Sequence, residues 1–373
     1  LRAAYGETGR APTAGAALRT LQPAPYAIQA GTSVTSAAGA TPFNPGNENL
    51  KPERGAEIEA GFDASVFTDR VNLELTYFNK VSRDVLVIQP LPPSLGFQQN
   101  PFVNIGEMRN RGVELGLTAQ LVQLRRFGWT SRVNFNTLNN EIVSLGSVPP
   151  FGTLNRFTPG FQAGSWVTKT IRSVDVANSR VVVADTFEVA GNVLPTLEAA
   201  WSNSFDLFGN FRVATLIDTK RDFLVYNNTD FFRETQLVRS DRRLDPTVLS
   251  PEERLRRYGN QVPGRPAFVQ ENGAPSNVNE VREEFLQPGD FVRFRELSVT
   301  YTIPSGVSAR LLRGLGGSIG VAFQNLALWT DYEGPDPEVI SSTANNGTAQ
   351  FARDDFLTLP NPRRALFRVN LNF

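Results

Sequence analysis

The sequence predicts an all-β protein, the C-terminal portion of an antiparallel transmembrane β-barrel with about ten strands. Three observations support this fold class. Apolar and polar residues alternate along many segments, 30 Gly and 25 Pro residues punctuate the chain, and the connections alternate between short and long. A period of two is typical of strands with one apolar face, and Gly and Pro mark turns. Short turns at one end and long loops at the other are typical of barrels that cross a membrane.

The alternation is clearest in a few segments and continues to the end of the chain. In "VNLELTYF" the side chains of Leu73, Leu75 and Tyr77 fall on one face, with polar residues on the other. In "RRALFRVNLNF" Val369 and Phe373 share the apolar face, so we expect the final residue to be paired and packed. Segments of this kind predict strands near residues 1–8, 56–67, 70–86, 109–122, 127–141, 196–206, 210–222, 291–303, 315–329 and 364–373.

The connections between these strands differ in length. Brief turns are expected at residues 68–69, 123–126, 207–209 and 304–314, and long loops at 9–55, 87–108, 142–195, 223–290 and 330–363. Loops longer than about 15 residues are uncommon in compact soluble domains. If every long loop lies outside the cell, the last strand runs inward and leaves Phe373 at the periplasmic rim. We therefore expect short periplasmic turns, long extracellular loops and a periplasmic C-terminus.

Two short helices are expected in the connections. In "SPEERLRRYG", Ser250 is a candidate N-cap, Glu253 completes a capping box, Pro251 occupies the first helical position and Gly259 ends the helix. A solvated surface helix on an outer loop is the simplest interpretation. The turn "PSGVSARLLRGLGG" is expected to hold the second helix, on the periplasmic side.

Aromatic residues occur where a membrane-interface girdle would place them. Amphipathic rings are stable at headgroup level, and such rings flank the apolar band of membrane barrels. The candidates open or close strands or surround a turn, and they are Trp129, Phe205, Phe208, Phe211, Trp329, Tyr332 and Phe373.

The composition excludes several classes of function. The 373 residues include 37 basic and 37 acidic side chains, with neither Cys nor His. Zero net charge argues against a nucleic-acid partner, and the lack of Cys and His removes thiol and imidazole catalysis and the usual zinc sites. We predict no enzyme activity, no catalytic residue and no cofactor. Because the chain opens at Leu1 without a leader and its only methionine is Met108, we expect the C-terminal piece of a longer protein.

Two groups of loop residues have chemical interest. "DYEGPDPEV" brings Asp331, Glu333, Asp336 and Glu338 close together, and carboxylates suit hard cations such as calcium. Their spacing does not follow the EF-hand pattern and two prolines favour a rigid loop, so no metal site is predicted. Five loop Phe residues could stack on sugar rings, but scattered rings do not define a binding site, so the substrate-binding residues stay unknown: Phe151, Phe157, Phe161, Phe231 and Phe232.

Several longer stretches resemble one known family. "NPGNENLKPERGAEIEAGFDASVFTDRVNLELTYFNKVSRDVL" resembles the barrel of TonB-dependent receptors, in which an "N-x-x-LKPE" segment precedes a strand, a tight turn and a second strand. "PPSLGF" followed by "NIGEMRNRGVELGL" is similar to the SusC/RagA-like branch. "GDFVRFRELSVTYTIP", "VAFQNLALWTDYEGPDPEV" and "PNPRRALFRVNLNF" are similar to the closing strands of that branch. The resemblance covers most of the chain in the right order.

The resemblance implies an active transporter in the outer membrane that imports nutrients such as glycan oligosaccharides or peptides. It further implies energy from the TonB complex, a SusD-type surface lipoprotein as partner, contact with outer-membrane lipid, and reading of Phe373 by the barrel assembly machinery. In this family an N-terminal plug fills the lumen and contacts TonB. We expect the plug and the first strands to be absent from residues 1–373, because transporters of this kind have about 22 strands.

Two other classes of protein share part of the pattern. A passive porin or autotransporter-type barrel would have the same strands and loop asymmetry without a plug or TonB. A soluble β carbohydrate-binding module would have alternating strands, but its apolar face would be buried against protein. In the barrel, Val369 faces lipid and Asn370 faces the lumen, so Arg should be tolerated less well at the first position.

Overall fold

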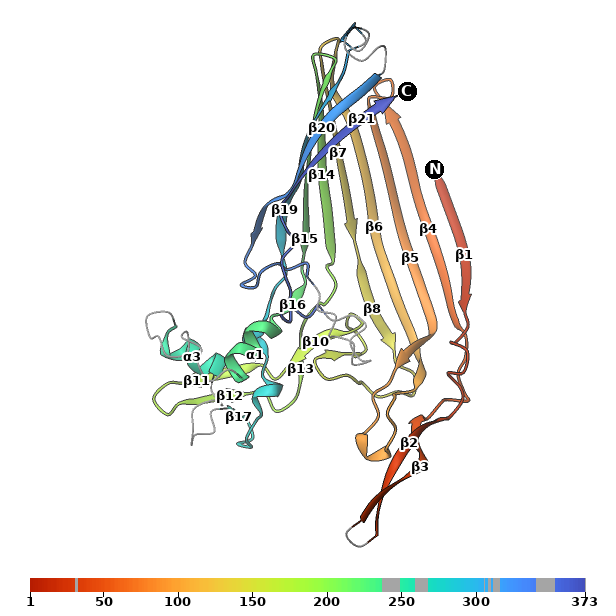
Figure 1. Cartoon of the computed structure of the whole chain (residues 1–373), viewed down its shortest axis with the longest axis vertical. Helices are drawn as coiled ribbons and strands as arrows, with labels where there is room; N and C mark the ends of the chain where they lie inside the picture. The colour runs from red at the N-terminus through yellow and green to blue at the C-terminus, as the bar shows by residue number, and fades with distance from the viewer. Residues whose placement is uncertain are drawn as a thin grey trace.

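A computed structural model describes residues 1–30, 33–236, 249–258, 268–304, 306–307, 310, 316–339 and 353–372. Its main feature is one antiparallel sheet in which every strand pairs with its neighbours along the path (Figure 1). The strands, in spatial order, are β1 (Arg2–Arg10), β4 (Glu53–Val66), β5 (Val71–Ile88), β6 (Phe102–Leu124), β7 (Phe127–Thr137), β14 (Leu197–Leu207), β15 (Phe211–Arg221), β19 (Phe291–Thr302), β20 (Gly316–Thr330) and β21 (Arg364–Asn372). These strands match the ten predicted ones, so the fold class is confirmed.

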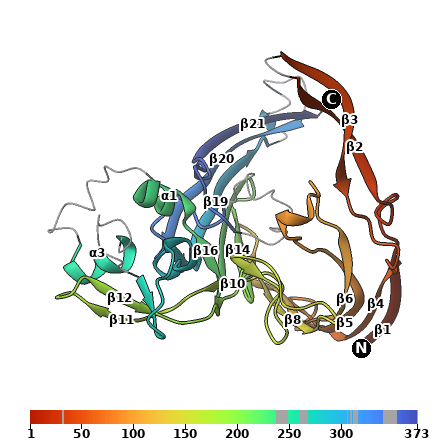
Figure 2. The same cartoon turned by 90° about the horizontal axis from the view of Figure 1, so that it is seen from below.

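The sheet is a curved wall whose two ends are β1 and β21. Figure 2 looks along the strands and shows the wall as an open arc. The predicted strand at residues 127–141 is divided, because β7 pairs with β6 and β14 whereas β8 (Asn139–Ser144) pairs with β6 alone. β5 and β6 are longer than predicted, at 18 and 23 residues, and exceed the 9–11 residues that a bilayer requires. Both strands therefore continue beyond a membrane-sized span.

The two ends of the wall differ as predicted. Three of the expected short turns connect strands at one end, at residues 67–70, 125–126 and 208–210. Phe67, Thr68 and Asp69 all have positive φ in the first of these turns. The second predicted helix, between residues 304 and 317, lies largely outside the described residues. Among the described residues, no helix is long and apolar enough to cross a membrane.

The long loops at the other end contain small elements, of which only the helix at Pro251–Tyr258 was predicted from the sequence. A two-stranded hairpin of β2 (Thr20–Ala30) and β3 (Ser33–Asn44) projects away from the wall, and η1 (Pro93–Leu95) follows β5. The remaining pieces form what we call the loop layer: β9 (Asn155–Arg156), β10 (Ser165–Thr168), β11 (Ile171–Asp175), β12 (Arg180–Val183), β13 (Glu188–Gly191), β16 (Leu224–Tyr226), α1 (Asn228–Gln236), α3 (Pro251–Tyr258), β17 (Phe268–Gln270), η3 (Val278–Glu280), η4 (Glu283–Phe285) and β18 (Leu286–Pro288).

Helix α3 begins with the predicted capping box. The backbone N–H of Glu253 donates to Ser250 Oγ at 3.2 Å, and the backbone N–H of Ser250 donates to Glu253 Oε2 at 2.8 Å. The two bonds satisfy donors that a helix start leaves unpaired. Pro251 opens the helix as predicted, and Gly259, the predicted stop, lies outside the described residues.

Most fully buried apolar side chains lie at the long-loop end. Trp166 packs with Val193, Tyr226, Phe231 and Phe285 in one cluster of the loop layer. A second cluster surrounds Phe268, and two more join the loops to the ends of wall strands around Ile105 and Phe291. The loop layer therefore has the hydrophobic core of an ordinary water-soluble domain.

The wall separates apolar and polar residues onto two faces. Strand register aligns the apolar side chains in rows, one of which contains Leu73, Leu117, Val133, Trp201 and Ile217. We call this side the outer face and the opposite, polar side the inner face. On β21 the predicted alternation is present, since Val369 lies opposite Ile319 while Asn370 Nδ2 donates to Ser318 Oγ at 3.1 Å.

Candidate functional site

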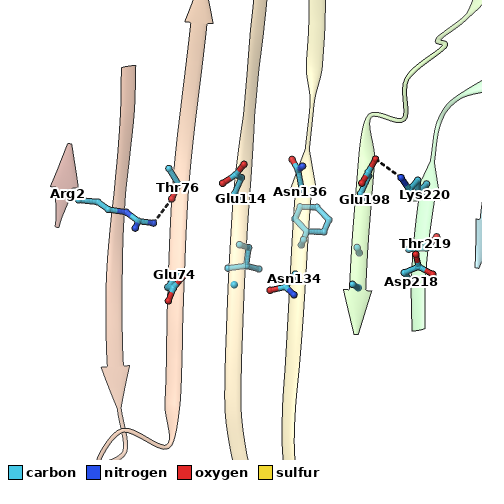
Figure 3. A pocket seen from close by; sticks show the side chains of 15 residues that line it. Arg2, Glu74, Thr76, Glu114, Asn134, Asn136, Glu198, Asp218, Thr219 and Lys220 are labelled. Carbon is cyan, nitrogen blue, oxygen red and sulfur yellow. Dashed lines mark hydrogen bonds and ion pairs between the residues drawn. The ribbon is translucent and has the colours of Figure 1, made fainter. Parts of the chain in front are cut away.

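The inner face carries a recess of about 420 Å³ at the middle strands of the wall. Each strand contributes polar residues through its alternation, and the register brings them into line across five strands (Figure 3). One such row consists of Thr76, Glu114, Asn136, Glu198 and Lys220. The recess can therefore offer a band of hydrogen-bond donors and acceptors to a polar molecule in the lumen.

Acidic side chains outnumber basic ones in the recess. Lys220 forms an ion pair with Glu198 at 3.2 Å, and Arg2 Nη2 donates to Thr76 Oγ1 at 2.5 Å. Within the described part of the chain, no ion pair engages Glu74 or Glu114, although both line the recess. Two carboxylates therefore keep their acceptor oxygens available for a ligand or for another part of the barrel interior.

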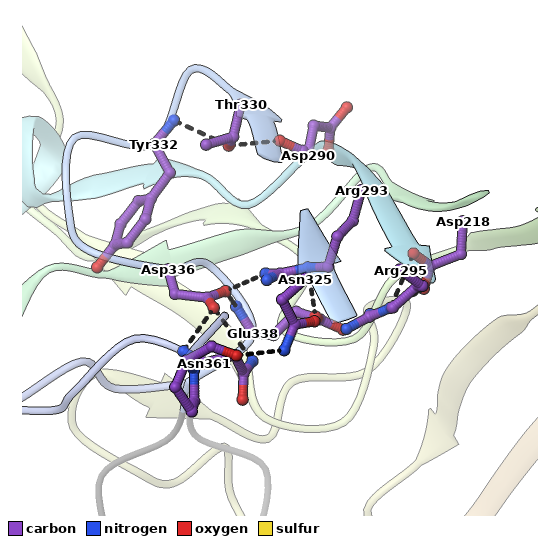
Figure 4. A network of polar contacts seen from close by, with 11 residues as sticks. Asp218, Asp290, Arg293, Arg295, Asn325, Thr330, Tyr332, Asp336, Glu338 and Asn361 are labelled. Carbon is purple, nitrogen blue, oxygen red and sulfur yellow. Dashed lines mark hydrogen bonds and ion pairs between the residues drawn. The ribbon is translucent and has the colours of Figure 1, made fainter. Parts of the chain in front are cut away.

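A buried polar network lies at the long-loop end of the inner face (Figure 4). Arg293 on β19 pairs with Asp336 and lies 3.1 Å from Glu338, and Arg293 and Asp336 are only 2% and 1% exposed. Asp336 also accepts hydrogen bonds from the backbone N–H groups of Glu338 and Asn361, at 3.0 and 3.1 Å. Both ends of the loop between β20 and β21 are thus anchored at the same carboxylate.

A β-bulge adds a second arginine to this network. Phe294 pairs with Ala327 and Glu296 pairs with Gln324, so the register skips Arg295 between them. Bulges redirect side chains in this way. The Nε of Arg295 lies 2.9 and 2.8 Å from the two carboxylate oxygens of Asp218, and its Nη2 donates to Glu338 at 2.6 Å.

Arginines therefore surround the acidic loop at residues 331–338, for which the sequence predicts no metal site. Asp336 and Glu338 pair with Arg293 and Arg295, and Glu333 pairs with Arg257 at 3.2 Å. Burial by itself would raise the pKa of Asp336, but the hydrogen bonds from Glu338 and Arg293 outweigh it and hold that pKa below its usual value. In the described ranges, no group of three or more acidic side chains could hold a metal ion.

Residues 353–358 dock against the loop layer through Asp355. The fully buried Asp355 accepts a hydrogen bond from Tyr332 Oη at 2.7 Å, and its backbone N–H donates to Tyr226 O at 2.9 Å. Burial and this contact raise the pKa of Tyr332. Burial also raises the pKa of the neighbouring Asp354 to about 6, against a hydrogen bond from Asn228 that lowers it.

The structure separates the five loop Phe residues. Phe157 and Phe231 are buried at 5% and 6% exposure, and Phe151 stacks on Phe157 with ring centroids 4.8 Å apart. Phe161 and Phe232 are 44% and 39% exposed. The five rings thus do not form one platform, and Phe161 and Phe232 alone retain a large accessible surface.

Some of the predicted girdle residues lie on the outer face or are exposed, whereas one is buried. Trp129 stacks on Phe205 at 5.7 Å on the outer face near the short turns, while Phe208 and Trp329 are 73% and 56% exposed. The interpretation of Tyr332 as a girdle residue is wrong, because Tyr332 is 5% exposed and donates to Asp355 inside the protein. Phe211 lies near the short turns, and its ring centroid is 4.7 Å from that of Tyr301. Phe373 lies outside the described residues.

The sequence analysis named no residue of the recess. Of the arginine network it named the acidic residues Asp336 and Glu338 but not their partners, Arg293 and Arg295. The polar positions of each strand were visible as the alternate set in the period-two pattern, so the polar wall could have been predicted. Its rows could not, because register across separate strands does not follow from one strand's pattern.

The chain matches a family model described as "TonB dependent receptor-like, beta-barrel" over residues 1–326. TonB-dependent receptor P3 of Formosa agariphila is 26% identical over 408 residues, which cover 100% of this chain and 39% of that protein. TonB-dependent receptor P39 of the same organism is 23% identical and covers 91% and 37%. TonB-dependent receptor SusC of Bacteroides thetaiotaomicron is 22% identical and covers 80% and 31%. The chain thus spans less than half the length of these relatives.

Solved structures show the same fold. The structure of the RagAB peptide transporter superposes with a TM-score of 0.73 at 19% identity, covering 100% of this chain and 40% of that one. The RagAB peptide importer in its open-open state gives a TM-score of 0.69 at 18% identity. A match to a receptor family over most of the chain confirms the prediction that the protein is not an enzyme. With an apolar outer face, a polar inner face and this match, the chain belongs to the TonB-dependent receptor family, as part of a SusC/RagA-like outer-membrane β-barrel.

Proposed function

We propose that residues 1–373 form the C-terminal part of the barrel of an energised importer for nutrients, either glycan oligosaccharides or peptides. The observation that carries this proposal is the curved wall with an apolar outer face and a polar inner recess of about 420 Å³. Such a wall suits a lumen through which a polar ligand passes. The relatives are more than twice as long, which supports a whole protein with a plug domain and further strands.

The wall is proposed to stand with its long loops outside the cell and its short turns in the periplasm. The last strand then runs inward and the C-terminus is periplasmic. The aromatic pairs Trp129–Phe205 and Phe211–Tyr301 near the short turns support an interface at that end. Reading of Phe373 by the barrel assembly machinery is part of the same proposal.

The proposed partners act at opposite ends. The TonB complex would engage the plug from the periplasm, and a SusD-type lipoprotein would cover the long loops. The β2–β3 hairpin supports a protein contact there, because residues 20–44 contain no charged side chain and Leu21 is 60% exposed. SusC and the RagAB transporter are similar proteins, and they suggest the two ligand classes.

Uptake by cells that carry the full-length receptor tests this function. Labelled oligosaccharides and peptides are offered separately, with and without a protonophore that removes the energy source of TonB. We expect uptake of one class, and its loss when the protonophore is added. Uptake that is insensitive to the protonophore would contradict the proposal and indicate a passive porin.

A variant of the recess tests whether the inner face of the wall contacts the transported ligand. Glu74→Gln combined with Glu114→Gln removes two carboxylates that line the recess and is expected to weaken ligand uptake. Glu271→Gln, in the exposed loop after β17, is the matched control and should leave uptake unchanged. Equal uptake by both variants would show that the recess does not contact the ligand.

A further inference from the structure

Basic side chains gather on the outer face at the long-loop end of the wall. Strand alternation puts the arginines of β4, β5 and β6 on the same face as Ile58 and Tyr77, which are 53% and 45% exposed. A lysine from the segment just before β4 joins them. This cluster, which we call the basic patch, consists of Lys51, Arg54, Arg83, Arg109 and Arg111.

The basic patch lies just beyond the apolar band. Arg54 is four residues closer to the long loops than Ile58 on the same strand, which corresponds to roughly 13 Å. On β6, Arg111 stands two residues beyond Val113, which pairs with Tyr77. The outer face thus changes from apolar to basic over a few rows, at the level where lipid headgroups replace acyl chains.

The strand register brings like charges together. Arg54 lies directly opposite Arg83, an arrangement that destabilises a sheet unless an anion neutralises it. Glu107 is shared, at 3.3 Å from Arg83 and 3.5 Å from Arg109. Within the described ranges, Lys51, Arg54 and Arg111 have no ion-pair partner. The patch therefore has guanidinium groups that its own carboxylates leave uncompensated.

Two recesses open beside these groups. Lys51, Arg54 and Arg83 line a recess of about 660 Å³, in which Glu7 and Asp84 are the acidic members. A second recess of about 750 Å³ is lined by Arg111 together with the exposed rings of Tyr77 and Phe161, and by Glu141 and Asp222. Guanidinium groups match phosphate oxygens in a bidentate geometry. The first recess therefore suits a phosphate group better than an apolar ligand.

We propose that the basic patch binds the phosphate groups of a lipid headgroup in the outer leaflet of the outer membrane. The patch faces outward, away from the lumen, and borders the apolar band, so a membrane lipid is the anion that reaches it. The inference rests on the orientation proposed above and not on the transported ligand. It adds a lipid site to the barrel, with Arg54 and Arg83 as its central pair.

The test uses the full-length receptor in detergent, titrated with three probes and followed by native mass spectrometry. The probes are bisphosphorylated lipid A, the same lipid after removal of its phosphates, and inorganic phosphate. The test variant combines Arg54→Gln with Arg83→Gln, and Arg125→Gln combined with Arg126→Gln at the β6–β7 short turn is the matched control. We expect the test variant to bind lipid A at least about tenfold more weakly and the control to bind normally.

The outcomes separate the sources of phosphate. Equal binding of lipid A with and without phosphates, or equal binding by the test variant and the unchanged receptor, would overturn the proposal. Full competition by inorganic phosphate at the same concentration would show a free-phosphate site and also overturn it. Because the patch lies outside the lumen, the test variant should retain uptake, which shows that it folds. A failure of transport with intact lipid binding would instead count against the proposed function.

Discussion

The wall and the loop layer are parts of one chain that bury their apolar side chains in opposite ways. In the loop layer Trp166 is fully buried, with its Nε1 donating to Leu224 O at 2.9 Å. On the wall Trp201 is 46% exposed on the outer face, although its strand β14 is paired on both sides, with β7 and β15. The loop layer is thus built for water and makes its own core, whereas the wall is built for lipid and leaves its apolar surface to the bilayer.

The largest expected difference between the two regions is the cost of replacing a tryptophan with alanine. Trp166→Ala leaves a cavity in the loop layer and is expected to destabilise it by about 3–5 kcal/mol. Trp201→Ala removes a half-exposed ring of the outer face together with its hydrogen bond to Ser131 Oγ at 2.9 Å, but it leaves no core cavity, so its cost should be smaller. Hydrogen exchange of the loop-layer amides, measured in the full-length receptor, checks the difference, and equal losses of protection would contradict it.

An added charge should destabilise the wall more on its outer face than on its inner face. Trp201→Arg places a guanidinium on the outer face and is expected to cost roughly 2–4 kcal/mol at mid-bilayer depth. Ser202→Arg puts the same group on the inner face, where water and polar side chains solvate it, and should be tolerated better. Folding into lipid vesicles measures both. Similar costs would mean that the two faces have been assigned wrongly.

A pH effect is expected where residues 353–358 dock against the loop layer. The pKa of Asp354 is about 6 in the folded state, above its usual 3.8, because burial disfavours the charged form. Between these values the folded chain holds a proton that the unfolded chain has lost, so stability falls as pH rises from about 4 to about 6. Protection factors around Tyr226 should show this slope, and Asp354→Asn should abolish it. An unchanged slope in the variant would assign the effect to another group.

The smallest expected effect concerns the capping box of α3. Ser250→Ala removes the oxygen that accepts from the Glu253 backbone N–H and should cost about 1 kcal/mol locally. Ser250→Asp keeps an acceptor and is the matched control. Exchange of the α3 amides is the measurement, and the strands of the wall should not respond. A response in the wall would show that the two regions unfold together.

The wall could be predicted from the sequence because each of its strands is long enough to show a period of two. The loop layer could not, because β9 and β16 have two and three residues, too few for any periodicity. The β2–β3 hairpin was missed for a different reason: Pro23 and Pro25 lie inside β2, and proline argues against a strand.

In the candidate site, too, some residues could be predicted from the sequence while their partners could not. The acidic residues around Asp336 were visible in the sequence, but their partner Arg293 lies 43 residues away and enters through strand pairing. The bulge that turns Arg295 toward Asp218 has no local sequence signal. Tyr332 had the position of a girdle residue, and only the fold shows that it reaches Asp355 inside the protein. Tertiary pairing decided each case.

The most direct test of the two-faced wall is the water accessibility of consecutive positions along β15. The chain contains no cysteine, so single Cys variants at Ala214, Thr215, Leu216 and Ile217 each carry the only thiol of this region. A membrane-impermeant maleimide is applied to the full-length receptor in outer-membrane vesicles. We predict labelling at Ala214 and Leu216 and protection at Thr215 and Ile217. Labelling of all four positions, or of the opposite pair, would contradict a wall with lipid on its outer face and a water-filled lumen on its inner face.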